Sequence, residues 1–369
     1  MDKVMKQAAL LSLTDPYIKR DGGTLRTRAM IGALEKCGFD VECVYPTGDA
    51  SRRNEGRPAM GRLASSRQAA SAAKRHFLPL PTELGQRSTA LGTEVRRLEP
   101  SLTVTSVLSQ AQFVDPRNSV FWLDFMDIWS EFGRREADRR TGLSKMASRT
   151  QSRWLRAREN KYCNAAHVVT AAGWSDWKTL VAHGHRDAVW LPNPIADDSF
   201  ETVPRASGEP NVAGLIGNFE YWPNREAYRT VIDSWLPRLV DSGWRVVVAG
   251  SGSDALEQRP GVIALGHVDN LNDYYGQIDV TLAPIDLGGG MKVKVLESFS
   301  RGVPVVGTAF AFDGFPEEVR ALGITVDLAE PDLTGLQDLI RVDPTSPVLQ
   351  QFTTSAFNAK VHRILADVT

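Results

Sequence analysis

The sequence predicts an α/β protein built from two doubly wound, Rossmann-like domains. Short apolar runs alternate with longer amphipathic runs along the 369 residues, and most of the apolar runs show no polar alternation. Strands that are apolar on both faces are typical of parallel sheets covered by helices. A stretch rich in Pro, Asp and Ser at 191–210 separates two halves, each of a length that suits one domain.

The first half contains six predicted strands and is expected to form one domain, residues 1–195. The apolar runs lie at 8–13, 40–46, 103–108, 119–127, 167–172 and 188–193. Helical patterns lie between most of them. In 24–38, for example, Leu25, Ala29 and Ala33 share one face, and Gly38 provides a stop.

The second half repeats this alternation and is expected to form a domain over residues 196–345. Its predicted strands lie at 211–218, 245–250, 262–268, 280–285, 303–308 and 323–327. The tail 348–368 shows a helical pattern with Phe357, Val361 and Ile364 on one side. Residues 346–369 are therefore expected to form a C-terminal helix that packs back toward the first domain.

The overall net charge of −1 hides an asymmetry between the halves. Residues 1–200 hold 30 basic and 22 acidic side chains (+8), and the remainder holds 13 and 22 (−9). The basic excess concentrates at 52–97 and 134–161. Such stretches indicate either solvated helix faces or attraction to an anionic lipid surface or acidic acceptor. Nucleic acid is not expected, because neither stretch interleaves aromatic residues as binding modules do.

Composition also bounds the location of the protein. The chain is 42% apolar and 24% charged, and no apolar run approaches the roughly 20 residues of a membrane helix. Its three cysteines, Cys37, Cys43 and Cys163, show no metal or redox spacing and suit a reducing compartment. We expect a cytoplasmic protein, with peripheral contact to the inner face of the membrane as an open possibility.

Three consecutive glycines, Gly288, Gly289 and Gly290, follow the apolar run 280–285 and precede a helical pattern that begins near Met291. Open α/β sheets bind ligands at the carboxyl ends of their strands, and a helix N-terminus offers unpaired N–H groups to anions. Lys292 and Lys294 would add positive charge for a diphosphate. The alternative is a flexible loop followed by a helix with a surface Lys294–Glu297 pair. The chemistry alone leaves both readings open.

The segment PIDLGGGMKVKVLESFSRGVPVVGT (284–308) resembles the donor site of family-four, or group 1, retaining glycosyltransferases. LIGNFEYWPNREAYRT (215–230), VVVAGSG (246–252) and GHVDNLNDYYGQIDVTLAPI (266–285) are similar to other parts of that domain, and KRDGGTLRTRAMIGALEKCG (19–38) resembles the first glycine loop. The resemblance implies the glycosyltransferase B fold, in which two Rossmann-like domains face a central cleft. It is specific from about 211 to 315.

The resemblance also implies roles for individual residues. Glu297 would bind the nucleotide ribose, the glycine loop and nearby lysines would hold the diphosphate, and Gly266 and His267 would border the base. Gly22 and Gly23 would face the phosphates or the donor sugar. The implied donor-binding set is Gly22, Gly23, Asn224, Gly266, His267, Gly288, Gly289, Gly290, Met291, Lys292, Lys294 and Glu297, with Lys292 and Glu297 also counted as catalytic.

The sequence departs from the family pattern at two places. Many relatives carry a second Glu eight residues before the ribose-binding one, where it contacts the donor sugar, but this chain has Gly289. The sugar contact must therefore come from elsewhere. The usual basic pair after the first strand of the nucleotide domain is replaced by Asn224 and Arg225, and Arg225 is either a phosphate ligand or an exposed residue at a helix start.

The implied reaction is metal-independent transfer of a sugar, with retention of configuration, from a nucleotide sugar to a hydroxyl acceptor. UDP is the commonest nucleotide among relatives. The sequence contains no Asp-x-Asp motif of the kind that holds a metal in glycosyltransferases of the other common fold, and no cofactor or metal site is expected. Asp124 and Asp127, in FWLDFMDIWSEF (121–132), are candidates to orient the acceptor hydroxyl or to cap the following helix.

Several aromatic and histidine residues have two readings. Trp122, Trp129 and Trp222 either stack on sugar rings or pack in the core. His183 and His185 are expected in a turn rather than at a metal. The acceptor is either a cell-envelope or polysaccharide intermediate, lipid-linked or free, or a small natural product.

Three other functions compete with transfer. A dehydrogenase is suggested only by Gly-x-Gly-x-x-Ala at 250–255, a pattern that needs an acidic residue about 20 positions further on at a strand end. Asp269 lies near that distance but follows Gly-His-Val in an expected loop. A nucleotide-sugar 2-epimerase shares the fold that the resemblance implies. A non-catalytic sugar-nucleotide binder is motivated by the missing glutamate at Gly289.

Overall fold

The computed structural model describes residues 6–13, 15–17, 22–45, 89–206, 211–257 and 259–368. The chain divides into two compact units. Unit 1 comprises Met1–Ala172, Asp176–Trp190 and Lys360–Thr369, and unit 2 comprises Gly173–Ser175 and Leu191–Ala359. The domain boundaries expected from the sequence, after residues 195 and 345, stay predictions. The basic residues at 52–87 lie outside the described part of the chain.

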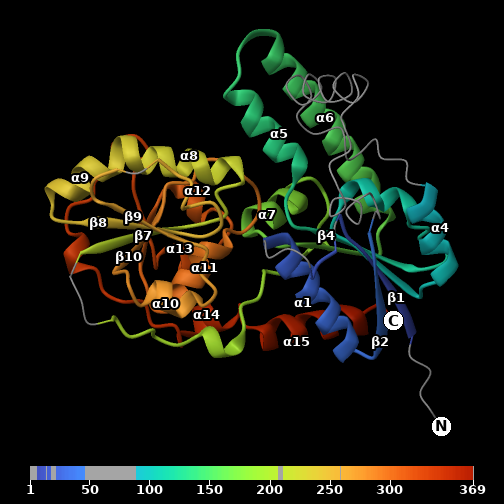
Figure 1. Cartoon of the computed structure of the whole chain (residues 1–369). Helices are drawn as coiled ribbons and strands as arrows, with labels where there is room; N and C mark the ends of the chain where they lie inside the picture. The colour runs from blue at the N-terminus through green and yellow to red at the C-terminus, as the bar shows by residue number, and fades with distance from the viewer. Residues whose placement is uncertain are drawn as a thin grey trace, which may run out of the picture. The chain divides into compact units, whose positions relative to one another are not determined.

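Unit 1 contains a six-stranded parallel sheet in the order β2-β1-β3-β4-β5-β6 (Figure 1). Its strands are β1 Lys6–Leu11, β2 Phe39–Val44, β3 Leu102–Thr105, β4 Val120–Phe125, β5 Val168–Ala171 and β6 Val189–Trp190. The main helices are α1 Gly22–Lys36, α4 Thr89–Leu98, α5 Trp129–Asp138, α6 Gly142–Ala165 and α7 Trp174–Ala182, with a 3-10 turn at Leu108–Phe113. Every residue of β3 is buried, including the polar residues Thr103 and Thr105.

Unit 2 contains a second six-stranded parallel sheet, in the order β12-β11-β10-β7-β8-β9. Its strands are β7 Val212–Ile216, β8 Arg245–Ala249, β9 Val262–Gly266, β10 Val280–Ala283, β11 Val305–Gly307 and β12 Ile324–Thr325. Its helices are α8 Trp222–Thr230, a π segment Val231–Trp235, α9 Leu236–Asp241, α10 Leu271–Tyr275, α11 Val293–Ser300, α12 Ala309–Phe312, α13 Glu317–Arg320 and α14 Pro347–Gln350, with 3-10 turns at Asp197–Ser199 and Leu336–Asp338; α15, Thr354–Ala366, follows.

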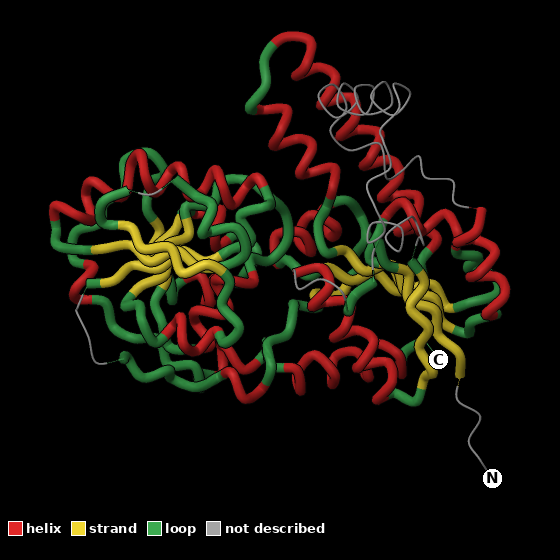
Figure 2. The backbone as a smooth tube through the Cα atoms, in the orientation of Figure 1, coloured by secondary structure: helices red, strands yellow, loops and turns green. Residues whose placement is uncertain are grey.

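In each unit the strands form a central layer with helices on both faces (Figure 2). One core cluster in unit 2 joins strand residues such as Val246 and Leu282 to Trp235 and Leu239 of the covering helices, all of them fully buried. Burying each such side chain contributes about 1.5–3 kcal/mol. The predicted α/β class with two doubly wound sheets is confirmed, and all twelve predicted strands are present.

The predicted C-terminal helix 348–368 differs from the structure, because the chain forms two helices, α14 and α15. The amide of Ile195 donates to the carbonyl of Phe352 (2.8 Å), and the amide of Thr354 donates to the carbonyl of Ile195 (2.9 Å). A continuous helix would need these backbone groups for its own hydrogen bonds. Pairing with Ile195 therefore ends one helix and starts the next.

The strand order places the topological switch point of unit 2 between β7 and β10. From β7 the chain proceeds to β8 and β9 on one side, and β10, β11 and β12 follow on the other. The loops after β7 and β10 therefore diverge at the carboxyl edge of the sheet, which is where open α/β sheets bind ligands. In unit 1 the corresponding point lies between β1 and β3.

Candidate functional site

The loop after β10 forms a tight elbow, residues 288–292, at the switch point of unit 2. Gly288 has φ +125° and Gly290 has φ +59°, which are conformations that other residues rarely adopt. α11 then begins at Val293, with Lys292 as its N-cap. The two positive φ values turn the chain so that a helix N-terminus, with its unpaired amides, faces the switch point. The glycines predicted to form an anion-binding loop therefore do form the turn that such a loop requires.

Lys292, the last residue of the elbow, bonds to the elbow's own backbone and so acts as a clamp on it. Its ammonium donates to the carbonyls of Gly289 (2.8 Å) and Gly290 (3.0 Å). The same Nζ atom lies 4.4 Å from the centroid of the Phe310 ring, a cation–π contact. Lys292 thus adds positive charge at the elbow and also fixes its backbone, a role that the sequence reasoning did not include.

The elbow is also held from its other side. Met291 is buried, and a Cβ atom added to Gly314 would lie 2.7 Å from the Cα of Met291 and 2.9 Å from the carbonyl oxygen of Gly290. Only glycine permits so close an approach of two backbones. The amide of Trp174 donates to the carbonyl of Gly314 (2.8 Å). The elbow therefore packs directly against the backbone of Gly314.

Lys294 reaches from α11 across the switch point to α8. Its ammonium donates to Oδ1 of Asn224 (2.9 Å), and Nδ2 of Asn224 donates to the carbonyl of Asn218 (2.8 Å). Burial, with a smaller effect from Lys292, lowers the pKa of Lys294 to about 8, although Glu297 opposes the shift. Lys294 does not form the exposed surface pair with Glu297 that was the alternative reading.

Glu297 lies one turn along α11 from Lys294 and is half-buried. Burial raises the pKa of its carboxyl group, while Arg301 and Lys294 oppose that shift. Within the described ranges, the carboxylate has no hydrogen-bond partner. The Arg301 guanidinium instead donates to the backbone carbonyl of Glu297 (3.0 Å) and to Oδ1 of Asn272 (2.8 Å). Glu297 therefore offers an open acceptor beside the elbow, as its expected ribose contact requires.

The loops after β7, β8 and β9 form the rest of this edge. A Cβ atom on Gly250 (φ +117°) would lie 2.0 Å from the carbonyl oxygen of Gly217, so the loops after β7 and β8 are in direct backbone contact. The amide of Gly250 donates to the carbonyl of Gly266 (2.7 Å). His267, next along, is exposed and lies 3.5 Å from Oγ of Ser251. Gly266 and His267 are thus at the same edge as the elbow.

Two sequence alternatives are resolved by this geometry. Residues after Gly250 form turns rather than a helix, so the dinucleotide-binding pattern at 250–255 lacks the helix it needs. Arg225 is exposed in α8 and donates to the carbonyls of Phe219 (2.9 Å) and Glu220 (2.8 Å). Arg225 therefore supports the loop after β7, as expected of a residue at a helix start.

In unit 1 the structure differs from the role predicted for Asp124. Asp124 lies inside β4 and is buried; its carboxylate accepts two bonds from Arg26 (2.7 and 2.6 Å) and others from Thr170 (2.6 Å) and Ser106 (3.2 Å). Its hydrogen-bond partners all belong to the protein itself, so this carboxylate is not available to an acceptor hydroxyl. Nor does it cap α5, whose N-cap is Ile128.

The remaining predicted residues of unit 1 lie as follows. Asp127 is half-buried in the bend between β4 and α5. Gly22 and Gly23 form the first residues of α1, four and three residues before the buried Arg26. Arg26 was missed, because its partner Asp124 lies 98 residues away and no local pattern links the two.

Two of the three tryptophans pack in the core of unit 1, and both histidines lie in a turn, as one of the expectations for them stated. Trp122 is fully buried and donates from Nε1 to Thr170 (2.8 Å), so it packs in the core. Trp129 packs against the core of unit 1, whereas Trp222 is exposed at the start of α8. His183 and His185 lie in the turn after α7. Among the residues that the structure describes, no group of three or more His, Cys, Asp or Glu side chains could hold a metal ion.

Comparison with known proteins supports the sequence resemblance. Residues 210–340, most of unit 2, match the family described as "Glycosyl transferases group 1". The predicted resemblance is therefore confirmed over the part of the chain that carries the elbow, and a glycosyltransferase is the enzyme class supported. The comparison with curated proteins finds no match.

Solved structures extend the comparison over the whole chain. The chain is similar to sucrose-phosphate synthase from Thermosynechococcus elongatus (TM-score 0.68, 14% identity, 98% of this chain and 99% of that chain). It is also similar to Anabaena HepE in complex with UDP-glucose (0.61, 12%, 98% and 100%) and to the apo lipopolysaccharide outer core galactosyltransferase WaaB (0.56, 12%, 99% and 100%). At these identities the likeness shows the fold, which is the predicted glycosyltransferase B fold.

Proposed function

We propose that this chain, whose residues 210–340 match group 1 glycosyltransferases, transfers a sugar from a UDP-sugar to a hydroxyl acceptor. The observation that carries the proposal is the elbow at 288–292, with the open carboxylate of Glu297 and the half-buried ammonium of Lys294 at one switch point. Amides and an ammonium suit paired phosphates, and a carboxylate suits ribose hydroxyls. Structures of the similar Anabaena protein HepE contain UDP or UDP-glucose, which supports UDP as the nucleotide.

The reaction would proceed by electrostatic stabilisation of the leaving diphosphate. The bond between the anomeric carbon and the phosphate oxygen breaks, a bond from the acceptor oxygen to the anomeric carbon forms, and the acceptor proton passes to the leaving phosphate oxygen. The N-terminus of α11 and the ammonium groups of Lys292 and Lys294 would stabilise the charge that develops on UDP. Transfer of the proton to the leaving group on the same face of the sugar fits retention and needs no separate base.

Metal-independent transfer is part of the proposal. The sequence has no Asp-x-Asp motif, and the cationic groups at the elbow can neutralise the diphosphate in place of a divalent ion. A test is activity or UDP binding in the presence of EDTA. Undiminished binding supports the proposal, whereas loss that Mg²⁺ or Mn²⁺ restores would contradict it.

The α5–α6 hairpin supports an acceptor held at an anionic membrane surface. Residues 134–161 hold ten basic and three acidic side chains. On α6 the exposed residues recur at helical spacing and include Leu143 (83% exposed), Met146 (66%) and Trp154 (43%), next to Arg149 and Arg153. A stripe that combines apolar and basic side chains suits the interface of an anionic bilayer. Within the described residues, no helix is long and apolar enough to cross a membrane.

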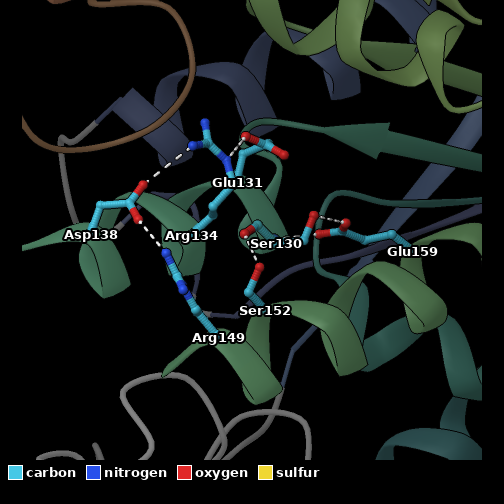
Figure 3. A network of polar contacts seen from close by, with 7 residues as sticks. All are labelled: Ser130, Glu131, Arg134, Asp138, Arg149, Ser152 and Glu159. Carbon is cyan, nitrogen blue, oxygen red and sulfur yellow. Dashed lines mark hydrogen bonds and ion pairs between the residues drawn. The ribbon is translucent and has the colours of Figure 1, made fainter. Parts of the chain in front are cut away.

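The hairpin is held by a network of polar contacts (Figure 3). Glu159 of α6 is buried and accepts bonds from the amide (2.9 Å) and the hydroxyl (2.5 Å) of Ser130, and Ser152 donates to the carbonyl of Ser130 (2.7 Å). Nearer the tip, Arg134 and Arg149 both contact Asp138. These contacts fix α5 against α6, so the stripe is presented on a supported helix.

The membrane proposal is tested by binding of the protein to vesicles. Wild type should bind vesicles of anionic phosphatidylglycerol at low salt and release them at high salt. Met146→Asp should weaken this binding without changing UDP affinity, and Thr150→Asp, which changes the same exposed face without removing an apolar residue, separates the apolar effect from the charge effect. Equal binding of neutral and anionic vesicles would contradict the role of the basic side chains, and failure to bind either kind would contradict the proposal and favour a small natural-product acceptor.

Because Gly289 replaces the sugar-binding glutamate of many relatives, a non-catalytic sugar-nucleotide binder is a second candidate function. A nucleotide-sugar 2-epimerase is a third, and its product identifies it. The protein is incubated with a panel of UDP- and GDP-sugars, and the released nucleotide and the sugar are identified. Released UDP supports transfer or slow donor hydrolysis. Free 2-epimer supports the epimerase, and tight binding without turnover supports the binder. Failure to bind any nucleotide would overturn the proposed function.

A further inference from the structure

Asp313 lies beside the elbow with a carboxylate that has no hydrogen-bond or ion-pair partner within the described residues. It follows α12, a helix of four residues that Thr308 caps by accepting a bond from the amide of Ala311 (3.2 Å). Asp313 is the C-cap of this helix, and its side chain is half-buried. The carboxylate of Asp313 therefore keeps its capacity to accept hydrogen bonds from water or from a ligand.

The residues on both sides of Asp313 contact the elbow. Phe310 lies three residues earlier, and its ring meets the ammonium of Lys292 at 4.4 Å. Residues three apart on a helix share a face, so Asp313 lies on the side of α12 that faces the elbow. Gly314, the next residue, packs against Met291 and Gly290. Asp313 therefore lies between two residues that contact the elbow, beside the proposed phosphate site.

Stability does not account for this residue. A carboxylate at the C-terminus of a helix opposes the helix dipole, and the last turn of α12 contains no basic residue to offset it. Beside a site for phosphates it would also repel the ligand's negative charge. Any favourable contribution of Asp313 to ligand binding must therefore come from a neutral part of the ligand that donates hydrogen bonds. In a nucleotide sugar, that part is the sugar with its hydroxyl groups.

We propose that Asp313 accepts hydrogen bonds from hydroxyls of the transferred sugar and restricts the donor to neutral sugars. This inference rests on the proposed function and assigns the sugar contact that is missing at Gly289 to a different loop. A uronic acid at the same place would bring a second carboxylate toward Asp313. Like charges that meet in a partly dehydrated site disfavour binding.

Calorimetry with three ligand types tests the inference. The ligands are UDP, the neutral UDP-sugar that binds wild type most tightly among UDP-glucose, UDP-galactose and UDP-N-acetylglucosamine, and UDP-glucuronic acid. Wild type should bind the neutral UDP-sugar about tenfold or more tightly than UDP-glucuronic acid. Asp313→Asn should weaken the neutral sugar about tenfold, strengthen UDP-glucuronic acid, and leave UDP within about twofold.

Controls separate this inference from the proposed function. Asp241→Asn, at the exposed C-terminal end of α9, should change none of the three affinities. If wild type binds no nucleotide, the proposed function fails. If wild type binds UDP but Asp313→Asn leaves the ratio of neutral to acidic sugar unchanged, or weakens UDP and both sugars equally, the assignment of Asp313 is wrong. Asp313→Ser serves as a second variant should the Asn protein fold poorly.

Discussion

Both units hold charged side chains near the carboxyl edge of their parallel sheet, but they use them in opposite ways. In unit 1 the carboxylate of Asp124 is buried and receives bonds from Arg26, Thr170 and Ser106. In unit 2 the carboxylate of Glu297 has no hydrogen-bond partner within the described ranges, and Lys294 bonds only the neutral side chain of Asn224 there. A charge that is fully paired holds a scaffold together, whereas a charge with spare bonding capacity can bind a ligand.

The strongest way to test this comparison is to remove the paired carboxylate. Asp124→Ala should lower the free energy of unfolding by about 3–5 kcal/mol, because it removes the carboxylate that pairs with the buried Arg26 guanidinium. Urea denaturation measures the change. Glu94→Ala, which breaks the exposed pair with Arg97, should leave the midpoint nearly unchanged. A small effect of Asp124→Ala would show that the buried pair is not what stabilises unit 1.

The matching change in unit 2 should affect function and leave stability intact. Glu297→Gln should lower kcat/KM for the nucleotide sugar about 100-fold, because a charged acceptor for ribose hydroxyls becomes a neutral one. Nucleotide release measures the rate, and the melting temperature checks the fold. Glu318→Gln, an exposed glutamate in α13, is the matched control. Near wild-type kinetics would remove Glu297 from the site.

Lys292 and Lys294 should both contribute to UDP binding, but only Lys292 should also affect the backbone dynamics of the elbow. Lys292→Ala and Lys294→Ala should each weaken UDP binding by about 1–3 kcal/mol. Lys292→Ala also frees the carbonyls of Gly289 and Gly290, so it should raise amide hydrogen exchange across the elbow, which Lys294→Ala should not. Calorimetry and exchange mass spectrometry measure the two effects. Equal exchange in both variants would contradict the clamp role of Lys292.

The smallest expected effect is on pH dependence. Because the pKa of Lys294 is lowered to about 8, the ammonium loses its proton as pH rises through that value. If the charged form alone binds UDP, affinity should fall about tenfold between pH 7 and 9. In Lys294→Arg the fall should disappear, because a guanidinium stays charged there. A pH-independent wild type would mean that Lys294 does not meet the phosphates.

The stability of the unliganded protein should respond to Lys294 in the opposite direction. The pKa of Lys294 is lower in the folded chain (about 8) than its ordinary value of 10.5, so the unfolded chain binds more protons between these values. The contribution of Lys294 to the free energy of unfolding therefore rises with pH across that window.

The sequence predicted the sheets well because their strands are buried on both faces. All twelve runs became strands, although several run past the strand end, as in 119–127 against Val120–Phe125, because apolar residues continue into the loops. The break between α14 and α15 was missed, since it depends on backbone pairing with Ile195, more than 150 residues away. Pairings between distant segments leave no periodic signal in a single sequence.

The candidate site was predictable in its composition but not in its bonding. Glycine spacing and the helical pattern indicated the elbow, Lys294 and Glu297. That Lys292 would bond the elbow's own carbonyls follows from the positive φ of Gly288 and Gly290, which no sequence pattern specifies in detail. The pairing of Arg26 with Asp124 was hidden for the same reason as the helix break, because it joins residues 98 positions apart.

The Lys292 clamp has a consequence for the kinetics of association. Its bonds to Gly289 and Gly290 exist before any nucleotide arrives, so the elbow does not need to reorganise on encounter. UDP should therefore associate in one step, with an observed rate that rises linearly with its concentration and falls as solvent viscosity increases. A rate that levels off at high UDP would reveal a slow rearrangement of the loop.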